Sequence, residues 1–273
     1  MNIGLIAGNG TFPFLVLRAA VGLGHDVTVV GIQGEADTAL EELADDLGST
    51  TFAWIPLGHL ETCISTLTDA GVTQAVMAGQ VKHVKLFTDV MPDATMMAVL
   101  GRLATKNTDA LISGIAEALA SRGVTLMDST QLLPEFLARP GVLTAAVPSA
   151  DMLGDFAFGY RIADAVAGLD IGQTVVVKNR AVVAVEAMEG TDVVITRAGT
   201  LAGKNSRVVK VAKPGQDMRF DVPVVGVETV RAMHASGADG LSVDAGRTLI
   251  LDGDAFFRAA DEAGLVVVGR PQA

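Results

Sequence analysis

Short apolar runs alternate with longer amphipathic stretches along the first half of the chain. The runs at 3–7, 27–32, 75–78 and 124–127 predict strands, and the stretches at 12–23, 36–47, 60–70, 96–103 and 110–121 predict helices. A strand followed by a helix and a further strand is typical of parallel sheets that helices cover on both faces. The pattern therefore predicts an α/β fold whose first part is a Rossmann-like, doubly wound sheet.

Pro134, Pro140 and Pro148 interrupt this pattern, because proline disfavours both helix interiors and sheet ladders. The sequence thus divides into a first domain at 1–133, a linker at 134–149 and a second domain at 150–273.

The second domain mixes strands and helices less regularly. Helices are predicted at 151–168, 193–198, 228–235 and 255–263, and strands at 173–178, 181–186, 208–212, 222–225, 241–243, 248–251 and 265–268. The first two strands flank Asn179-Arg180, a pair that fits a hairpin turn. We expect a smaller, mixed α/β domain of the kind found in hydrolases.

Composition limits the possible functions. Half of the 273 residues are apolar, so the chain can bury a sizeable core. The formal net charge of −11 repels phosphate backbones and anionic lipid, which argues against general nucleic-acid binding and broad electrostatic adhesion to membranes. No window reaches the ~18 apolar residues of a membrane span, and the N-terminus lacks the cationic start of a signal peptide. Cys63, the single cysteine, is expected to pack in the interior of a cytosolic protein.

Two loops with glycines follow predicted strands of the first domain. Gly8–Pro13, which reads GNGTFP, opens the first helix, where backbone N–H groups and the helix dipole favour an anion such as a diphosphate. Gly79–Val81 follows the strand at 75–78, and doubly wound sheets bind ligands beyond the carboxyl ends of their strands. The loops are candidates for one ligand site. The alternative is that each is a glycine turn with a purely structural use.

In the second domain, the segment 186–192 reads EAMEGTD and separates a strand from a helix. Thr191 or Asp192 could cap that helix through a side-chain oxygen, and the neighbouring backbone amides could equally hold a phosphate.

Further on, Lys210, Lys213 and Arg219 precede Asp221 within a short span. These residues offer cations for phosphate oxygens and a carboxylate for a metal ion or a water molecule. The four histidines are scattered without metal-ligand spacing, so magnesium on oxygen ligands fits better than zinc. The alternative is a solvated cluster of surface charges.

Several segments together resemble a known family. They are Gly4–Gly10 with Pro13, Ala78–Val81, Asp170–Gln173, Glu186–Ala187 with Glu189–Asp192, and Arg219–Gly226. Over nearly the whole chain they look like the UDP-2,3-diacylglucosamine pyrophosphatase of the lipid A pathway, in its form unrelated to metallophosphoesterases. The resemblance implies a two-domain, magnesium-dependent homodimer. It would hydrolyse the diphosphate of UDP-2,3-diacylglucosamine to UMP and 2,3-diacylglucosamine 1-phosphate (lipid X).

The resemblance also implies roles for individual residues. Asp221 would be the catalytic carboxylate, and it is our candidate ligand for magnesium. The implied substrate contacts are Gly10, Thr11, Gly79, Gln80, Val81, Thr191 and Asp192, and we expect the cations Lys210, Lys213 and Arg219 to join them at the phosphates. A lipid substrate and the absence of a predicted membrane span together suggest a cytoplasmic protein with peripheral contact to the cytoplasmic face of the inner membrane.

Two other functions would use the same regions. An NAD-dependent oxidoreductase would bind its cofactor at Gly8–Pro13 with Glu35 on the ribose, but Pro13 replaces the small third residue of such loops. A regulator without catalytic activity would bind a nucleotide-lipid ligand between the domains. Magnesium-dependent release of UMP, a change in nicotinamide absorbance, or tight binding without turnover would distinguish the three functions.

Overall fold

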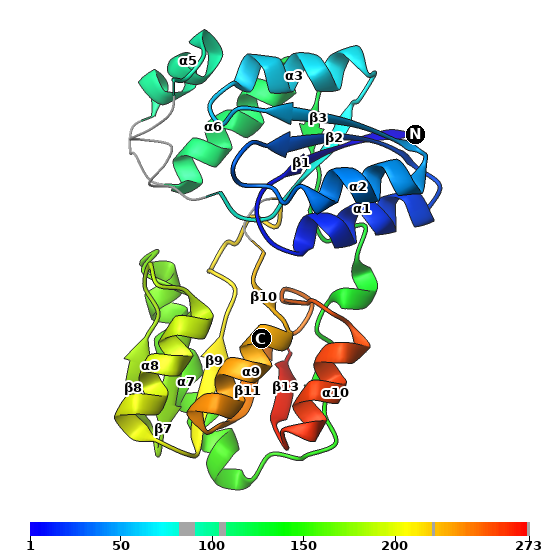
Figure 1. The fold of residues 1–273 in the computed structure, drawn as a ribbon. Helices are drawn as coiled ribbons and strands as arrows, with labels where there is room; N and C mark the ends of the chain where they lie inside the picture. The colour runs from blue at the N-terminus through cyan, green and yellow to red at the C-terminus, as the bar shows by residue number, and fades with distance from the viewer. Residues whose placement is uncertain (82–90, 104–107, 220–221, 272–273) are drawn as a thin grey trace. The chain divides into compact units, whose positions relative to one another are not determined.

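A computed structural model describes residues 1–81, 91–103, 108–219 and 222–271. The chain forms two compact units, which are considered separately below (Figure 1). Unit 1 comprises Met1–Leu133 together with Met218 and Arg219. Unit 2 comprises Pro134–Asp217 and the described residues from 222 onward.

Unit 1 contains a five-stranded sheet in the order β3-β2-β1-β4-β5, with every pair parallel. The strands are β1 (Asn2–Ala7), β2 (Asp26–Ile32), β3 (Thr50–Ile55), β4 (Gln74–Ala78) and β5 (Thr125–Leu126). This order confirms the Rossmann-like, doubly wound prediction. The prediction omitted β3, an edge strand in which most residues are only half-buried, so that its sequence lacks a clear apolar alternation.

Helices cover both faces of this sheet (Figure 1). One face carries α1 (Phe12–Gly22) and α2 (Ala39–Leu47), and the other carries α3 (Leu60–Asp69), α5 (Ala94–Arg102) and α6 (Thr108–Ser121). A core of buried side chains joins α3, α5 and α6 to the sheet. Packing on both faces explains why the strands read as continuous apolar runs.

Unit 2 contains a six-stranded mixed sheet in the order β6-β13-β11-β9-β7-β8. Its strands are β6 (Gly141–Val142), β7 (Thr174–Lys178), β8 (Ala181–Val185), β9 (Ser206–Lys210), β11 (Ala238–Asp244) and β13 (Val266–Arg270). The three central strands β13, β11 and β9 are parallel, whereas β6 and β7 run antiparallel to their neighbours. A separate parallel pair joins β10 (Val224–Val225) to β12 (Leu249–Ile250). The mixed α/β class predicted for this half is confirmed.

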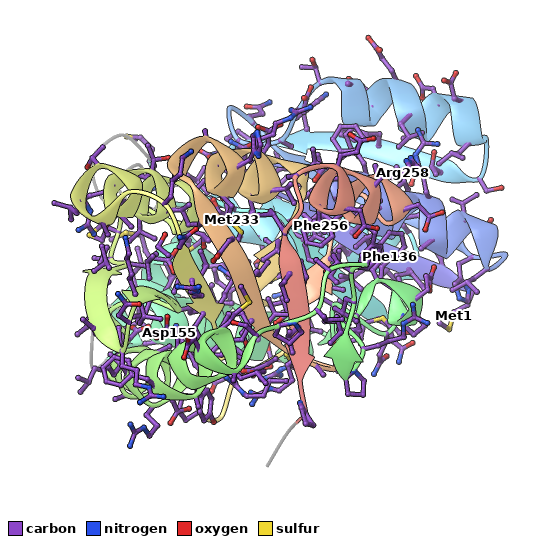
Figure 2. The ribbon with its side chains drawn as sticks, turned by 90° about the horizontal axis from the view of Figure 1, so that it is seen from below. Met1, Phe136, Asp155, Met233, Phe256 and Arg258 are labelled. Carbon is purple, nitrogen blue, oxygen red and sulfur yellow. The ribbon has the colours of Figure 1, made fainter. Side chains whose placement is uncertain are left out.

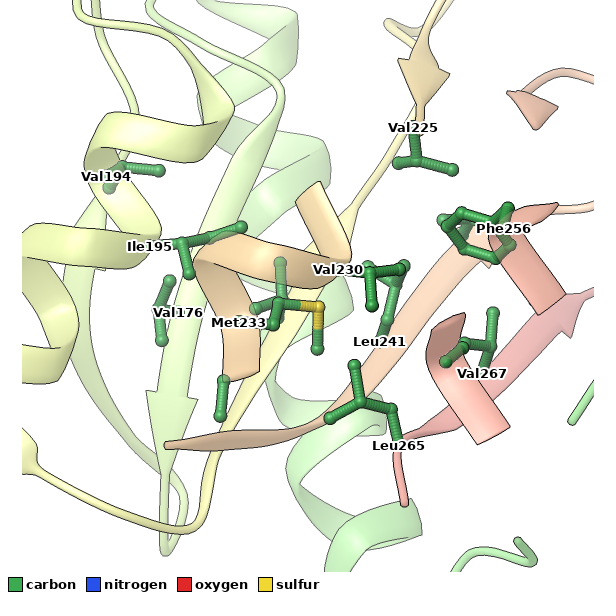
Figure 3. Close-up of a cluster of buried hydrophobic side chains, with 14 of the residues drawn as sticks. Val176, Val194, Ile195, Val225, Val230, Met233, Leu241, Phe256, Leu265 and Val267 are labelled. Atoms are coloured by element: carbon green, nitrogen blue, oxygen red, sulfur yellow. The ribbon is translucent and has the colours of Figure 1, made fainter. Parts of the chain in front are cut away.

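The helices of unit 2 pack on both faces of its sheet, with one hydrophobic core on each face. On one face, α8 (Thr191–Ala202), α9 (Val227–Ser236) and α10 (Asp254–Glu262) pack over a core that includes Val176, Met233 and Phe256 (Figure 3). On the other face, α7 (Ala150–Gly168) covers Val175 and Val177. Successive valines of β7 therefore face opposite sides of the sheet, as the two-residue period of a strand requires. Within the described ranges, no helix combines the length and apolarity that crossing a membrane requires.

The proline-containing segment 134–149, which the sequence suggests as a linker, is integrated into unit 2. It begins with a short 3-10 helix, η1 (Pro134–Phe136), and continues into β6, which pairs with β13. Leu137 also forms an isolated bridge with Leu249. These pairings satisfy backbone groups that a free linker would leave to water.

A buried carboxylate on α7 fixes the hairpin between β7 and β8. Asn179 and Arg180 occupy the left-handed region, with φ of 51° and 58°, as a tight hairpin turn requires. Both backbone N–H groups donate to Asp155, at 3.1 and 2.6 Å, and Arg207 Nη1 lies 3.3 Å from the same carboxylate. Figure 2 labels Asp155 on α7. The turn is therefore held by a charged acceptor that is only 2% exposed.

Candidate active site

The two predicted loops of unit 1 lie side by side at the carboxyl ends of adjacent strands β1 and β4. Asn9 and Gln80 form a backbone bridge, with Asn9 N donating to Gln80 O at 2.7 Å and Gln80 N donating to Asn9 O at 3.0 Å. A Cβ on Gly8 would lie 2.5 Å from Gln80 O, and one on Gly79 would lie 2.6 Å from Asn9 O. Glycine is required here by the close approach of two backbones.

The contact between the two loops occupies backbone N–H groups that would point toward the diphosphate in a dinucleotide-binding loop. Gly8 N donates to Ala78 O at 2.8 Å, and Asn9 N is already bonded to Gln80. Pro13 at the start of α1 has no backbone N–H. The surface of the two loops nevertheless remains accessible, because Gly10, Thr11 and Gly79 are exposed. The arrangement therefore argues against the NAD-binding alternative while leaving the loop residues open to contact with another ligand.

A segment far along the chain also belongs to this edge of unit 1. Ser129 N donates to Met218 O at 3.0 Å, and the Ser129 hydroxyl lies 2.6 Å from Arg219 O and 3.0 Å from Met77 O, near the end of β4. Ser129 is fully buried. Arg219, which the sequence grouped with the second domain, therefore has its backbone fixed to unit 1 by a residue 90 positions earlier.

A second group of polar residues gathers at one edge of the unit 2 sheet. Because β8 and β9 both run antiparallel to β7, the ends of β8 and β9 meet the start of β7. Glu186 follows β8, Lys210 ends β9, Thr174 begins β7, and Thr191 begins α8. Glu186, Lys210 and Thr174 are 7%, 6% and 0% exposed. A carboxylate and an ammonium group are thus buried together, an arrangement that requires hydrogen-bond partners for both.

Those partners form a chain of hydrogen bonds. Lys210 Nζ donates to Thr191 Oγ1 at 2.6 Å, and the Thr191 hydroxyl donates to Glu186 Oε1 at 3.0 Å. Gln173 N donates to Glu186 Oε2 at 3.1 Å. Gly172 permits this arrangement, since a Cβ there would lie 2.2 Å from Glu186 O. The Asp170–Gln173 and Glu186–Asp192 segments, separate in sequence, are therefore in direct contact.

Two further predicted residues lie around this cluster. Asp192 is in the first turn of α8, where the helix dipole favours its charge. Its Oδ1 is buried without a hydrogen-bond partner within the described ranges. Lys213 forms an ion pair with Asp170 at 2.6 Å. Thr191, Asp192 and Lys210 are thus grouped in unit 2, with Lys213 paired to the neighbouring loop.

An exposed ion pair closes the loop that follows Glu186. Arg197 Nη2 lies 2.6 Å from Glu189 Oε1, and this hydrogen bond lowers the pKa of the Glu189 carboxyl. The pair is on the surface, so it contributes little to stability. It nevertheless orders a loop that leads from the buried carboxylate to the start of α8.

Asp221, our candidate for the catalytic carboxylate and magnesium ligand, lies outside the described residues. Within the described ranges, no three or more His, Cys, Asp or Glu side chains gather as a metal cage. The sequence alone indicates no role for Ser129, Thr174 or Glu186. Glu186 could have been noticed as an acidic residue directly after an apolar strand, whereas the contacts of Ser129 depend on the tertiary fold.

Comparison with known proteins covers both units. The model of the LpxI N-terminal domain matches residues 2–136, and the model of the LpxI C-terminal domain matches residues 139–268. A curated relative from Caulobacter vibrioides, the UDP-2,3-diacylglucosamine pyrophosphatase LpxI, is 30% identical over 279 aligned positions. The alignment covers 98% of this chain and 97% of that relative. The chain therefore belongs to the LpxI family.

Proposed function

We propose that this protein hydrolyses UDP-2,3-diacylglucosamine to UMP and lipid X, in lipid A synthesis. The observation that carries this proposal is the match to both family domains and to a pyrophosphatase relative over nearly the full length of each chain. In the reaction, water adds to one phosphorus of the diphosphate and the bridging P–O bond breaks. The uridine-bearing and lipid-bearing phosphates leave as the two products.

The residues of unit 2 support the phosphate-binding part of this proposal. A buried ammonium group has three donors, and the Thr191 bond uses one of those of Lys210. Lys210 and the N-terminus of α8 are suited to hold phosphoryl oxygens in a fixed position before charge develops on them. Asp221, by the family resemblance, orients the attacking water and accepts its proton. Unit 1 contributes Gly10, Thr11 and the Gly79–Val81 loop as further substrate contacts.

We further propose magnesium as the metal. Magnesium commonly binds through one or two carboxylates together with substrate phosphates and water, so no complete protein cage is needed. Asp192 Oδ1, a buried carboxylate oxygen without a partner within the described ranges, fits one such position, and Asp221 would provide another. When bound, the ion would neutralise charge on the diphosphate oxygens.

A lipid substrate also implies contact with the cytoplasmic face of the inner membrane, and we propose that this contact is peripheral. Exposed apolar side chains flank the Glu186 cluster in sequence: Leu169 is 71%, Ile171 48%, Met188 89% and Val193 55% exposed. Such side chains can enter a bilayer surface without spanning it. Salt or carbonate washing should release the protein from membranes, whereas a requirement for detergent would contradict this proposal. We also expect a homodimer, which sedimentation equilibrium would test.

The activity is tested by incubating the protein with UDP-2,3-diacylglucosamine and Mg²⁺ in ¹⁸O-labelled water. We expect UMP and lipid X, with one product carrying the label and thereby identifying the attacked phosphorus. Chelation of magnesium should stop the reaction. Absence of both products from a folded protein would overturn the proposed function.

The role of Asp221 is tested in the same assay. Asp221→Ala should lower UMP release by at least ~10²-fold, as expected for loss of a general base or metal ligand. Its thermal midpoint and its binding of lipid X should be retained. The matched control is Asp46→Ala, which removes an exposed carboxylate from α2. A variant of Asp221 with more than about a tenth of wild-type turnover would exclude this role.

A further inference from the structure

The charges of Lys210 and Glu186 are buried, yet a threonine hydroxyl stands between them. Lys210 is 6% and Glu186 7% exposed. A buried charge without compensation is strongly unfavourable. The opposite charges of Glu186 and Lys210 are therefore linked through the hydroxyl of Thr191, with which both are hydrogen-bonded.

The direction of these hydrogen bonds follows from chemistry. An ammonium group can only donate, so Thr191 Oγ1 must accept from Lys210. The single hydroxyl proton of Thr191 is then directed to an acceptor, and Glu186 Oε1 lies 3.0 Å away. Glu186 itself is held by Gln173 N at 3.1 Å and by its own N–H, which donates to Thr174 O at 2.9 Å. A fixed carboxylate thus orients a hydroxyl, which in turn orients an ammonium group.

We infer that Glu186 is a positioning residue for phosphate recognition, acting through Thr191 and Lys210. This inference rests on the proposed function, because it assigns Lys210 to the diphosphate. Glu186 is turned toward Thr191 and the backbone of Gln173, and its own negative charge would repel a diphosphate. Its effect on turnover is therefore indirect: it holds the ammonium group in one place, which is the preorganisation that phosphoryl transfer requires.

The test is a double-mutant cycle in the complete protein with Glu186→Gln and Lys210→Met, measured as UMP release at saturating substrate and Mg²⁺. Glu186→Gln keeps the shape of the side chain and removes its charge. We expect kcat to fall about 10- to 100-fold, as for a displaced catalytic contact, at temperatures where circular dichroism shows the variant to be folded. In the Lys210→Met background, Glu186→Gln should lower kcat by less than about threefold, because the group through which it acts is gone. Glu262→Gln, an exposed carboxylate at the end of α10, is the control and should keep more than about half of wild-type kcat.

Each outcome has a distinct meaning. A wild-type protein without turnover would overturn the proposed function, and the inference that rests on it, whatever the variants do. An active wild type with an equally active Glu186→Gln variant would overturn the inference alone, as would equal losses from Glu186→Gln in the two backgrounds. If Glu186→Gln does not fold, the folding of the double variant with Lys210→Met tests the inference instead. Removing both charges should restore folding, and a double variant that stays unfolded would contradict the coupling of Glu186 to Lys210.

Discussion

At the scale of single residues, burial controls the reactivity of Cys63. Its pKa is raised to about 12 by burial, with a smaller contribution from the charge of Asp93. Since the thiolate is the nucleophile, a thiol with this pKa stays protonated at pH 8. We expect iodoacetamide to modify the folded protein at least ~10²-fold more slowly than the unfolded chain. Because Cys63 is the single cysteine, the mass of the intact protein measures this rate directly. Equal rates in the two states would contradict the assigned burial.

The buried carboxylate of Asp155 gives a second prediction at this scale. Asp155→Asn replaces an acceptor of two backbone N–H groups and an arginine with a side chain that also carries donors. We expect the free energy of unfolding to fall by about 2–3 kcal/mol, as for the loss of charge-assisted hydrogen bonds. Asp151→Asn, on the exposed first turn of the same helix, should change it by less than about 1 kcal/mol. Urea unfolding of both variants provides the comparison, and equal effects would refute the prediction.

At the scale of elements, the contact between α8 and α9 depends on a glycine. A Cβ on Gly199 would lie 2.9 Å from the backbone Cα of Ser236, so Gly199→Ala should force the helices apart. We expect a loss of about 1–3 kcal/mol, as for overpacking of a well-packed interface. Gly22→Ala near the end of α1 is the control, because nothing lies within 4 Å of the added Cβ. It should leave stability unchanged or raise it by up to about 1 kcal/mol. Thermal unfolding distinguishes the two variants, and a stabilised Gly199→Ala would disprove the close contact.

Sequence patterns predicted most elements because each is locally marked by its apolar period. β3 was missed, since an edge strand with half-buried positions carries no such period. β6 is a two-residue strand whose partner, β13, lies more than a hundred residues later. Prolines around β6 indicated an irregular segment, but they could not indicate this pairing.

The same distinction between local and long-range features applies to the candidate site. A helix start at Thr191 and a strand end near Lys210 were predictable, since both are local features. The hydrogen bonds that join them to Glu186 depend on how β7, β8 and β9 pair. The attachment of Arg219 to Ser129 depends on a contact across 90 positions. The residues suited to phosphate binding could thus be identified from the sequence, whereas the hydrogen-bond partners of those residues could not.

At the scale of the whole molecule, Ser129 connects the segment before Asp221 to unit 1. Ser129→Ala removes the hydroxyl that lies 2.6 Å from Arg219 O. The loss of one buried hydrogen bond should cost about 1–2 kcal/mol, or roughly 5- to 30-fold in the opening of this segment. Hydrogen exchange at 218–219, followed by mass spectrometry, should accelerate accordingly. Ser65→Ala, which removes an exposed hydroxyl from α3, should leave that exchange unchanged. Unaltered exchange in Ser129→Ala would show that the hydroxyl does not hold the segment.

Unit 1 is built from two segments that are far apart in the sequence, and this has a consequence for recombination. Met218 and Arg219 are encoded among the residues of unit 2, yet their backbones are bonded to unit 1. A recombination event at the boundary after Leu133 would combine the Ser129 surface of one parent with the 218–219 segment of the other. Both bonds end on backbone carbonyls, which every residue type carries, so residue 129 is the position whose side chain matters for this contact after such a crossover. Chimaeras cut after residue 133 should therefore keep the hydroxyl bond to Arg219 O when the first parent supplies a serine at position 129, and lose it when that parent supplies an alanine.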